Sequence, residues 1–426
     1  MILRSIDIEN YKGIEKLHVE FQEGVNLLIG NNRAGKTSLL KAIAILLSDY
    51  FFLINKRGKQ IVRETIDEDA YTTTVVIGGA VSHTVPHYPI VIEGTSSLYG
   101  EYHTHKIIKK NLSAFQESTN HKISTILKDL MGDPNIAMPL LCFQRAGRGK
   151  TIKSRKGTIT LSNEAPERVQ GYQSAFSKEL DMDEIQGWCV QMEFAAYQRR
   201  QEIREYKVFQ SLVRKFMSMI DGDAEQPTVY YSSLAGSIVY YNGVTEQPIH
   251  QLSSGYQAII CMILELAYRA VLLNPTMDDV GEQTEGVVLI DEIEMHLHPA
   301  WQWKVIGTLK ATFPNIQFII ATHSPIILSS AKKASLYFME SPNRVEKIND
   351  VYGYQVNDVL SILQGSEYQP KEIERCYDDA ERIFDNGEMD ELNKLLEKVE
   401  EEFANEPRVI EEFRNFVEVN RWVGDA

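Results

Sequence analysis

Cysteine is scarce and scattered in this chain. Among 426 residues there are four cysteines, Cys142, Cys189, Cys261 and Cys376, and no two of them form a CxxC pair. Such spacing indicates neither a disulfide framework nor a zinc site. We therefore expect four buried thiols.

Membrane-spanning and export signals are also lacking. The apolar run AIAILLSDYFFLI is interrupted by Asp49 and is shorter than the roughly 20 residues that span a bilayer. The first residues, MILRSIDIENYKG, do not have the pattern of a signal peptide. The sequence thus predicts a cytoplasmic protein with no membrane contact.

Positive charge is in deficit, with a net charge of −15, which argues against a protein coated in nucleic acid. Residues 371–426 hold 18 acidic and 8 basic side chains, giving −10, which leaves −5 for the other 370 positions. The acidity therefore belongs mainly to the tail. The chain is also longer than the roughly 250–300 residues that one core fills, so at least two packed units are expected.

The apolar pattern predicts an α/β fold. RSIDIENYKGIEKLHVEF alternates around a Tyr-Lys-Gly turn, VNLLI is typical of a buried strand, and a glycine-rich loop then leads into the helical stretch SLLKAIAILLS. MPLLCF, GVVLIDE and QFIIATH are further buried strands, and the last two end in polar residues, as parallel strands do when they deliver side chains to a site.

Other segments surround this core. Residues 67–102 are expected to form a small antiparallel insertion, residues 174–220 a helical subdomain, and residues 228–243 a hairpin. From about Gln355 onward the pattern is helical and charged, with apolar residues at helical spacing. These are Leu392, Leu395, Leu396, Val399 and Phe403, which pack on their own head or on a neighbour.

GNNRAGKT matches G-x-x-x-x-G-K-[ST] at every fixed position and stands between a predicted strand and helix. Its amides are expected to wrap nucleotide phosphates, with Lys36 bridging the β and γ oxygens and Thr37 reaching Mg²⁺. The predicted nucleotide-binding residues are Gly30, Asn31, Asn32, Arg33, Ala34, Gly35, Lys36, Thr37 and Ser38. A similar stretch, QRAGRGKT, has Gln144 in place of the first glycine and is not counted as a second phosphate loop.

Two strand ends carry candidate catalytic groups. Asp291 is expected to hold Mg²⁺, and Glu292 to polarise the attacking water, a role worth roughly 10²–10⁴ in rate. The alternative is that this pair caps a following helix. In ATHSP, His323 stands at the end of another apolar strand, where a neutral imidazole can contact a γ-phosphate or orient water. The alternative is that His323 is a core residue.

Three features leave alternatives open. HLHP contains an H-x-H pair, for which a structural turn is preferred over a metal site. Gln144 is either a sensor of Mg²⁺ or a surface amide. The segment QRAGRGKTIKSRKG is the best DNA-binding candidate, although a solvated loop or an arginine that serves ATP fits equally. Its basic residues are Arg145, Arg148, Lys150, Lys153, Arg155 and Lys156.

LSSGYQ opens a long apolar helical stretch and combines capping serines with a glycine, which suits either an ordinary cap or an anion. In order, GNNRAGKT, LSSGYQ, VVLIDE and ATHSP resemble the phosphate loop, signature motif, Mg²⁺/base strand and switch histidine of ABC-type ATPases. IENYKGIEKLHVEF is similar to the start of the SMC and RecF branch, and LIDEIEMHLHPAWQ with FPNIQFIIATHSP resembles its soluble bacterial relatives. The resemblance covers about residues 1–330.

The resemblance implies an α/β ABC-type P-loop ATPase head with a helical subdomain and a C-terminal helical extension. Two heads are then expected to close head to head over two ATP molecules with Mg²⁺, so that Ser254 and Gly255 cap the γ-phosphate held by a second subunit. Lys12 is expected to touch the nucleotide. LSSGYQ departs from the commoner LSGGQ at Ser254 and Tyr256, and Ser254 adds a Cβ where the family has glycine.

The resemblance also suggests a partner. The head is assigned to residues 1–354 and an acidic helical region, which docks a partner, to residues 355–426. The segment between MPLLCF and LSSGYQ is too short for a long SMC coiled coil, and the last part of the chain has no D-x-D of a Toprim nuclease. GYQVNDVLSILQG and the acidic segment after it look most like the ATPase subunit of Septu-type anti-phage systems, whose partner is an HNH nuclease.

These observations predict an ATP-hydrolysing switch that controls a nuclease supplied in trans, with DNA contacted through the complex. One rival is a stand-alone DNA-repair ATPase of the RecF/SMC type that acts directly on DNA. Another is a binding module that uses ATP structurally and hardly turns it over. For the tail, the rival is a solvated helical lid without a partner.

Overall fold

The computed structural model describes residues 1–56, 59–60, 64–66, 69–77, 81–119, 121–146, 167–176, 182–222, 227–349, 351–354, 359, 371–386, 389–403, 409–411 and 413–417. Contacts divide the chain into two compact units, Met1–Val359 and Leu360–Ala426. Each unit has a hydrophobic core of its own.

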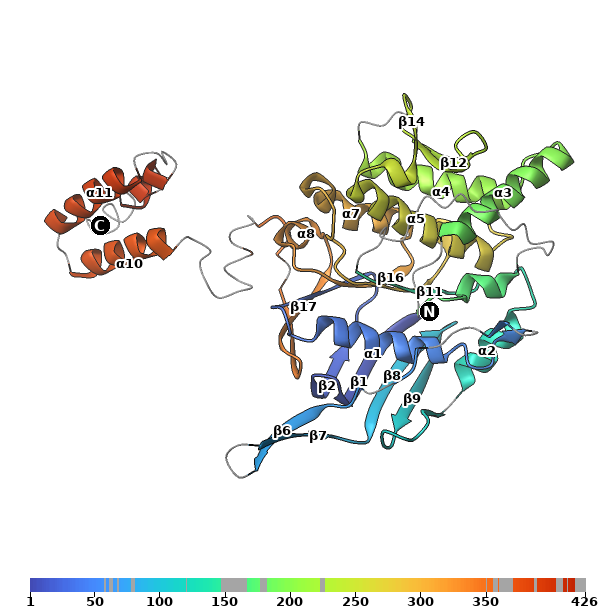
Figure 1. Ribbon diagram of the computed structural model, residues 1–426, viewed down its shortest axis with the longest axis horizontal. Coiled ribbons are helices and arrows are strands. Elements are labelled where there is room, and N and C mark those ends of the chain that lie inside the picture. The colour runs from blue at the N-terminus through green and yellow to red at the C-terminus, as the bar shows by residue number, and fades with distance from the viewer. Residues whose placement is uncertain are drawn as a thin grey trace. The chain divides into compact units, whose positions relative to one another are not determined.

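The centre of the first unit is a six-stranded sheet in the order β11-β15-β16-β3-β17-β18 (Figure 1). Its strands are β3 (Val25–Ile29), β11 (Leu140–Gln144), β15 (Gly286–Ile290), β16 (Ile316–Ala321), β17 (Ser335–Ser341) and β18 (Arg344–Ile348). All neighbours pair in parallel except β18, which pairs antiparallel with β17. The first four are buried throughout, as apolar parallel strands require, so the predicted buried strands are confirmed.

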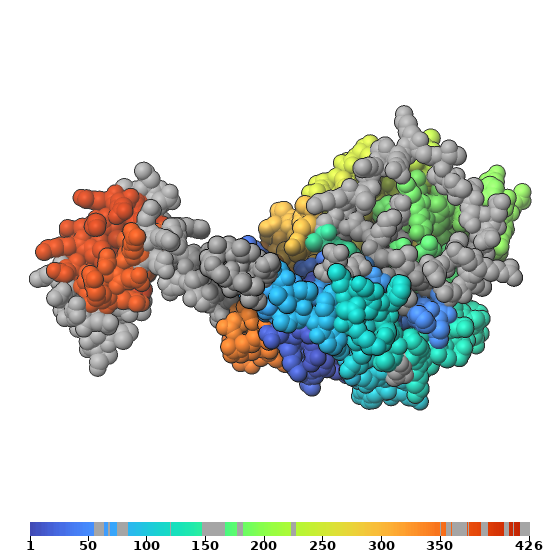
Figure 2. Space-filling model, turned by 60° about the horizontal axis from the view of Figure 1, so that its bottom comes forward, coloured from blue at the N-terminus to red at the C-terminus, as the bar shows by residue number. Residues whose placement is uncertain are grey.

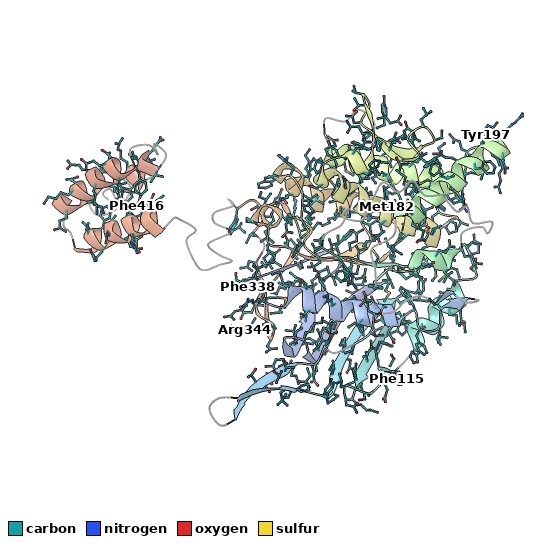
Figure 3. The ribbon with its side chains drawn as sticks, viewed as in Figure 1. Phe115, Met182, Tyr197, Phe338, Arg344 and Phe416 are labelled. Atoms are coloured by element: carbon teal, nitrogen blue, oxygen red, sulfur yellow. The ribbon has the colours of Figure 1, made fainter. Side chains whose placement is uncertain are left out.

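The edge formed by β17 and β18 was not predicted from the sequence. Phe338 of β17 and Arg344 of β18 are located on this edge in Figure 3. β17 nevertheless lies directly beside β3. It therefore flanks the glycine-rich loop that follows β3.

A second, antiparallel sheet has the order β10-β9-β8-β1-β2. Its strands are β1 (Ile2–Tyr11), β2 (Ile14–Glu20), β8 (Ile90–Leu98), β9 (Glu101–Lys109) and β10 (Glu117–Thr119). Helix α1 (Lys36–Asp49) contacts strands of both sheets and lies between them (Figure 1). This apolar helix is thus enclosed on two sides, and the blue and cyan strands of the second sheet form one face of the unit in Figure 2.

The insertion predicted for residues 67–102 is antiparallel but is not separate from the core. Strands β6 (Thr72–Ile77) and β7 (Val81–Pro86) form a hairpin, whereas β8 pairs with β1 along most of its length. Gly94 lets β8 pack closely against α1, because a Cβ at this position would lie 2.3 Å from Leu46 Cδ2 of that helix. The predicted antiparallel pairing is thus confirmed, while the pairing of β8 with β1 was not predicted, since pairing between distant strands leaves no mark in local periodicity.

The helical subdomain predicted for residues 174–220 is two helices, α3 (Met182–Arg199) and α4 (Arg204–Ile220). Residues 174–176 form a turn instead of helix. α3 ends where Arg200 adopts φ 54°, and the exposed Tyr197 lies near that end (Figure 3). The predicted hairpin is confirmed as β12 (Thr228–Ser232) and β13 (Ser237–Tyr241).

Helix α5 (Ser254–Leu273) is the long helix that follows LSSGYQ, and it packs against α4. Within the described part of the chain it alone is long and apolar enough to cross a membrane, but 78% of its apolar window is buried inside the unit. Its apolar surface is thus used as core. Helix α7 (Pro299–Thr312) also contacts α4.

The smaller elements of the first unit complete the chain order. They are β4 (Asn55–Lys56), β5 (Lys59–Gln60), α2 (Lys122–Leu130), η1 (Arg168–Tyr172), β14 (Glu246–Pro248), η2 (Ile249–Gln251), α6 (Val280–Gln283) and α8 (Pro325–Ser330). β14 extends the β12-β13 hairpin to three strands.

None of the four cysteines, all of which the structure describes, is part of a disulfide. Cys142 and Cys189 are buried, and burial raises the pKa of both thiols. Cys261 and Cys376 are partly exposed, so the prediction of buried thiols holds for two of the four.

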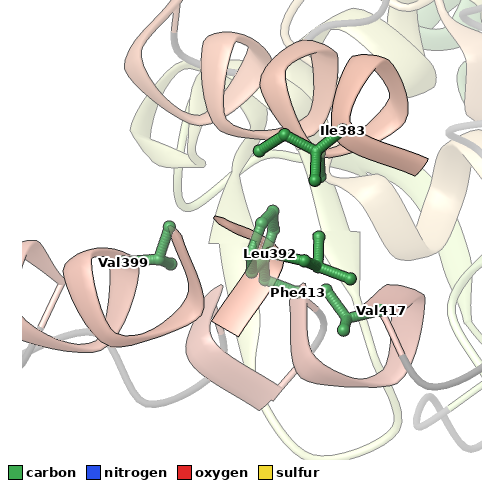
Figure 4. Close-up of a cluster of buried hydrophobic side chains, with 6 residues drawn as sticks. Ile383, Leu392, Val399, Phe413 and Val417 are labelled. Atoms are coloured by element: carbon green, nitrogen blue, oxygen red, sulfur yellow. The ribbon is translucent and has the colours of Figure 1, made fainter. Parts of the chain in front are cut away.

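The second unit contains α10 (Lys371–Asn386), α11 (Met389–Glu402) and further helical residues at 409–411 and 413–417. Their apolar faces meet in one cluster (Figure 4). Its buried members are Ala380, Ile383, Leu392, Val399, Phe413 and Val417. The predicted helical spacing of Leu392 and Val399 thus serves the core of this unit.

Candidate functional site

The glycine-rich loop between β3 and α1 depends on two of its glycines. Gly30 has φ 140° and Gly35 has φ 97°, which residues with a Cβ disfavour. A Cβ on Gly30 would also lie 2.2 Å from the carbonyl oxygen of Met339 in β17. The loop therefore packs closely against β17 as it turns from strand into helix.

A cavity of about 300 Å³ lies beside this loop. Three segments that are distant in the sequence supply its walls: the loop with the start of α1, the end of β15 and the end of β16. The lining residues are Asn32, Arg33, Ala34, Gly35, Lys36, Thr37, Ser38, Asp291, Glu292, Ala321 and His323. Neighbouring parallel strands place their carboxyl ends at one edge of the sheet, which is why these residues meet.

Lys36 is buried, and its ammonium donates hydrogen bonds to the carbonyl oxygens of Gly30 at 2.7 Å and Asn31 at 3.1 Å. Burial lowers the pKa of Lys36 to about 8, and the charges of Asp291, Glu294 and Glu292 oppose that shift. The loop itself thus holds the lysine at the cavity, opposite a group of carboxylates.

Thr37 and Asp291 form a pair of oxygen donors. Thr37 Oγ1 donates to the Asp291 carboxylate, at 3.1 Å from Oδ2 and 3.3 Å from Oδ1. The amide of Asp291 donates to the carbonyl oxygen of Gln144 at 2.9 Å, which extends the pairing of β15 with β11. Hydroxyl and carboxylate oxygens suit Mg²⁺, so the residues present fit this ion.

Glu292 lies in the turn that follows β15 and has φ 47°, a conformation that costs such a residue on the order of 1–3 kcal/mol. The turn is held by hydrogen bonds from Ile293 N to Ala321 O at 3.4 Å and from Met295 N to Glu292 O at 3.0 Å. The alternative that Asp291 and Glu292 cap a helix is wrong, because α7 begins only at Pro299 and its N-cap is His298.

His323 follows β16 after Thr322 and its side chain is exposed at the cavity, so the core-histidine alternative is wrong. Partial burial of the imidazole and then the charge of Lys36 lower the pKa of His323, while Glu294 opposes this. Its imidazole is consequently neutral at neutral pH. The backbone N–H of His323 donates a hydrogen bond to Glu294 Oε1 at 2.6 Å.

Glu294 was missed in the sequence. It lies two residues after Glu292 in LIDEIE, and its second oxygen accepts a hydrogen bond from Thr322 Oγ1 at 2.8 Å. The only local signal was a third carboxylate within four residues. Its partners lie 28 and 29 positions later, so the contact follows from the alignment of β15 with β16.

The N-terminus of α5 contributes no residue to the lining of the cavity. Ser254 is exposed there, while Gly255 is buried and a Cβ on it would lie 2.7 Å from the carbonyl oxygen of His296. Tyr256, one of the two departures from LSGGQ, donates its hydroxyl hydrogen to Asp221 Oδ2 at 2.8 Å. The departure at Tyr256 thus serves packing inside the unit, and Ser254 remains available on the surface.

Lys12 and Gln144 do not line the cavity. Lys12 is in the turn between β1 and β2, where its Nζ lies 3.0 Å from Asp69 Oδ1 in an ion pair. Gln144 is buried at the end of β11, and its Nε2 donates to the carbonyl oxygen of Met262 in α5 at 3.1 Å. The surface-amide alternative for Gln144 is therefore wrong, and its side chain ties β11 to α5.

The HLHP histidines belong to the turn before α7. His298 Nδ1 accepts a hydrogen bond from Ala300 N at 3.2 Å and caps the helix, and His296 has φ 68°. Within the described residues there is no group of three or more histidine, cysteine or acidic side chains arranged to hold a metal ion. The preferred structural role of HLHP agrees with this capping.

The basic segment falls mostly outside the described residues, because Arg148, Lys150, Lys153, Arg155 and Lys156 are not among them. Arg145 is described, and it forms an ion pair with Glu64 and donates to the carbonyl oxygen of Phe176 at 2.8 Å. Arg145 thus fastens the end of β11 to neighbouring segments.

Two family models match parts of the chain. A family model described as AAA ATPase domain matches residues 1–129, and one described as "AAA domain, putative AbiEii toxin, Type IV TA system" matches residues 190–329. The chain is 24% identical to the "Retron Vc95 probable ATPase" of Vibrio cholerae serotype O1 biovar El Tor, over 86% of this chain and 79% of the relative. It is also 24% identical to "Septu protein PtuA" of Bacillus thuringiensis, over 86% of this chain and 81% of the relative.

A solved SMC head bound to the C-terminal winged-helix domain of ScpA is similar to 82% of this chain and 98% of that chain, with 14% identity and a TM-score of 0.49. The family models and the names of the relatives support ATP hydrolysis.

Proposed function

We propose that this chain, an ABC-type P-loop ATPase, is the ATP-driven switch subunit of an anti-phage defence complex and controls a nuclease supplied by another protein. Relatives named as a retron ATPase and as a Septu protein support the defence role. The matched ATPase models support nucleotide hydrolysis as the event that operates the switch. The protein acts in the cytoplasm.

In this proposal the backbone amides of residues 30–38 bind the phosphates of ATP, and the Lys36 ammonium exchanges its loop carbonyls for β and γ oxygens. Thr37 and Asp291 hold Mg²⁺, which neutralises charge on the phosphates. Glu292 orients and polarises the attacking water, and the neutral His323 contacts the γ-phosphate from the opposite wall.

One observation carries the two-copy arrangement: the N-terminus of α5 has the features of an anion site but lies outside the cavity of its own chain. A helix N-terminus attracts phosphate through its free N–H groups and its dipole. Ser254 is exposed there. We infer that Ser254 and Gly255 complete the site of a second copy, so that two heads close over two nucleotides.

The second unit is the proposed docking module. It has its own core, and residues 371–426 carry −10 of the net charge of −15. An HNH-type nuclease with a basic surface suits this acidic unit as a partner. The opposite charges of the two surfaces set the rate and specificity of association. ATP-dependent closure of the heads then changes the activity of the docked nuclease on DNA.

Two measurements test this proposal. Glu292→Gln removes the carboxylate charge but keeps its shape, so we expect turnover to fall by roughly 10²–10⁴ and an ATP-bound dimer to accumulate in light scattering. Wild-type turnover of Glu292→Gln would contradict the mechanism. When the tagged protein is expressed from its native operon and purified, a nuclease should co-purify with it. Deletion of residues 371–426 should abolish this co-purification. An ATPase strongly stimulated by DNA alone, with no protein partner, would instead support the repair function.

A further inference from the structure

Glu294 holds the backbone beyond β16 through both oxygens of its carboxylate. Oε2 accepts a hydrogen bond from Thr322 Oγ1 at 2.8 Å, and Oε1 accepts one from the N–H of His323 at 2.6 Å. The donors belong to consecutive residues, so one carboxylate fixes this stretch at two points. Hydrogen bonds to a charged acceptor at such lengths are of the stronger kind.

The hydroxyl of Thr322 has a fixed direction. Thr322 is fully buried, and its oxygen also accepts a hydrogen bond from Ser324 N at 3.0 Å. Its own proton is consequently directed at Glu294. On the other side, Thr322 N donates to the carbonyl oxygen of Leu28 in β3 at 3.1 Å.

His323 is the exposed residue between two anchored neighbours. Ser324 is buried, donates to Gln302 Oε1 at 2.6 Å and accepts from Ile327 N at 3.3 Å as the N-cap of α8. The imidazole of His323 faces the cavity, whereas Glu294 is not part of the lining. Glu294 therefore contacts the cavity wall through the residue it holds, and its charge also acts on Lys36.

We propose that Glu294 is a positioning residue, which keeps the His323 imidazole at the wall of the cavity where it meets the terminal phosphate. This inference rests on the proposed function, in which His323 serves hydrolysis. Because Glu294 belongs to the same short turn as Glu292, the two walls of the site are joined through one carboxylate. Movement of the turn after β15 thus moves both Glu292 and His323.

The rival explanation is that Glu294 only stabilises the turn. A double-mutant cycle on kcat separates the two explanations, since residues that act through one contact are not additive. Glu294→Ala should lower kcat by about 100-fold, the size expected when a catalytic group is displaced by about 1 Å. Affinity for a non-hydrolysable ATP analogue should change by less than about twofold, because the phosphate loop keeps its contacts. In a His323→Ala background, Glu294→Ala should cause no further loss.

Two matched variants guard against misfolding. Thr322→Val keeps the shape of the side chain and removes one of the two Glu294 contacts together with the hydrogen bond from Ser324 N, so its kcat should lie between that of the wild type and that of Glu294→Ala. Ser324→Ala removes the α8 cap and the bond to Gln302 but leaves both contacts of Glu294. Its kcat should stay within about twofold of wild type if only the Glu294 contacts position His323.

The outcomes are distinct. If the losses of kcat in Glu294→Ala and His323→Ala multiply in the double mutant, the positioning role is overturned. A kcat for Glu294→Ala equal to that of Ser324→Ala would also overturn it. If His323→Ala hydrolyses ATP at the wild-type rate, the proposed role of His323 is itself wrong, and the positioning role is overturned with it. A normal His323 effect with an additive Glu294 effect would overturn this inference and leave the proposed function standing.

Discussion

The two units of this chain solve different physical problems. In the first unit, buried parallel strands fix Asp291 and His323 at one edge of a sheet, so that side chains far apart in sequence share a cavity. In the second unit, α10 and α11 enclose a small cluster around Leu392 and Phe413. The comparison indicates that the chemistry is built into rigid strand ends, while the tail offers a separately packed acidic surface. Changes in one unit should therefore leave the other unit intact.

The largest expected effect is a loss of ATP binding by the first unit that leaves the second unit unchanged. Lys36→Ala removes the buried ammonium that binds phosphate in the proposed function, so ATP affinity should fall by about 2–5 kcal/mol, or roughly 30- to 5,000-fold. Isothermal titration measures the affinity, and capture of the nuclease partner should survive in the absence of nucleotide. Equal ATP affinity in Lys36→Ala would contradict the assignment of the loop.

The contrast between the units also explains what the sequence revealed. The spacing of Gly30, Gly35 and Lys36 predicts the phosphate loop because each fixed position answers a local demand on the backbone or the ligand. Asp291 and His323 were predicted because each ends an apolar strand. The helices of the tail follow from apolar spacing, although that spacing did not specify which surface the apolar face covers.

Long-range pairing limited the rest of the prediction. Nothing local shows that β8 pairs with β1 or that β17 lies beside β3. The contacts of Glu294 depend on how β15 and β16 align, and the hydrogen bond from Gln144 Nε2 to a carbonyl of α5 depends on how β11 packs on that helix. The contact of Gln144 with Mg²⁺ stays a prediction. Lys12 was carried over by resemblance alone, and here it pairs with Asp69.

An intermediate effect should be confined to the second unit. Phe413 is fully buried in the cluster of Figure 4, so Phe413→Ala should destabilise that unit by about 3–5 kcal/mol. Limited proteolysis should then cleave the tail while ATP turnover of the isolated chain stays unchanged. The control is Glu401→Ala at an exposed site of α11, for which a change within about 0.5 kcal/mol is expected. Loss of ATP turnover in Phe413→Ala would show that the units are not independent.

The smallest effect is a pH dependence that reports on the first unit. Burial lowers the pKa of Lys36 to about 8, and the protonated amine is the form that favours phosphate. As pH rises from 7 to 9 the free protein loses this proton, so ATP affinity should fall by about tenfold. In Lys36→Met, affinity should be weak and nearly constant over the same range. An equal pH dependence in both proteins would assign the titration to another group.

The central claim is that each site combines the phosphate loop of one copy with the α5 N-terminus of another, and complementation between two inactive variants tests it most directly. Ser254 is exposed at the first turn of α5, where Glu is compatible with the helix but repels phosphate, so Ser254→Glu should fold and fail to hydrolyse ATP. Lys36→Ala should also be inactive.

Mixed in equal amounts, these two variants should regain about a quarter of wild-type turnover, because half of the dimers are mixed and each mixed dimer holds one intact site of two. A mixture as inactive as its components would contradict the account. It would mean that the residues of one chain do not complete the site of another.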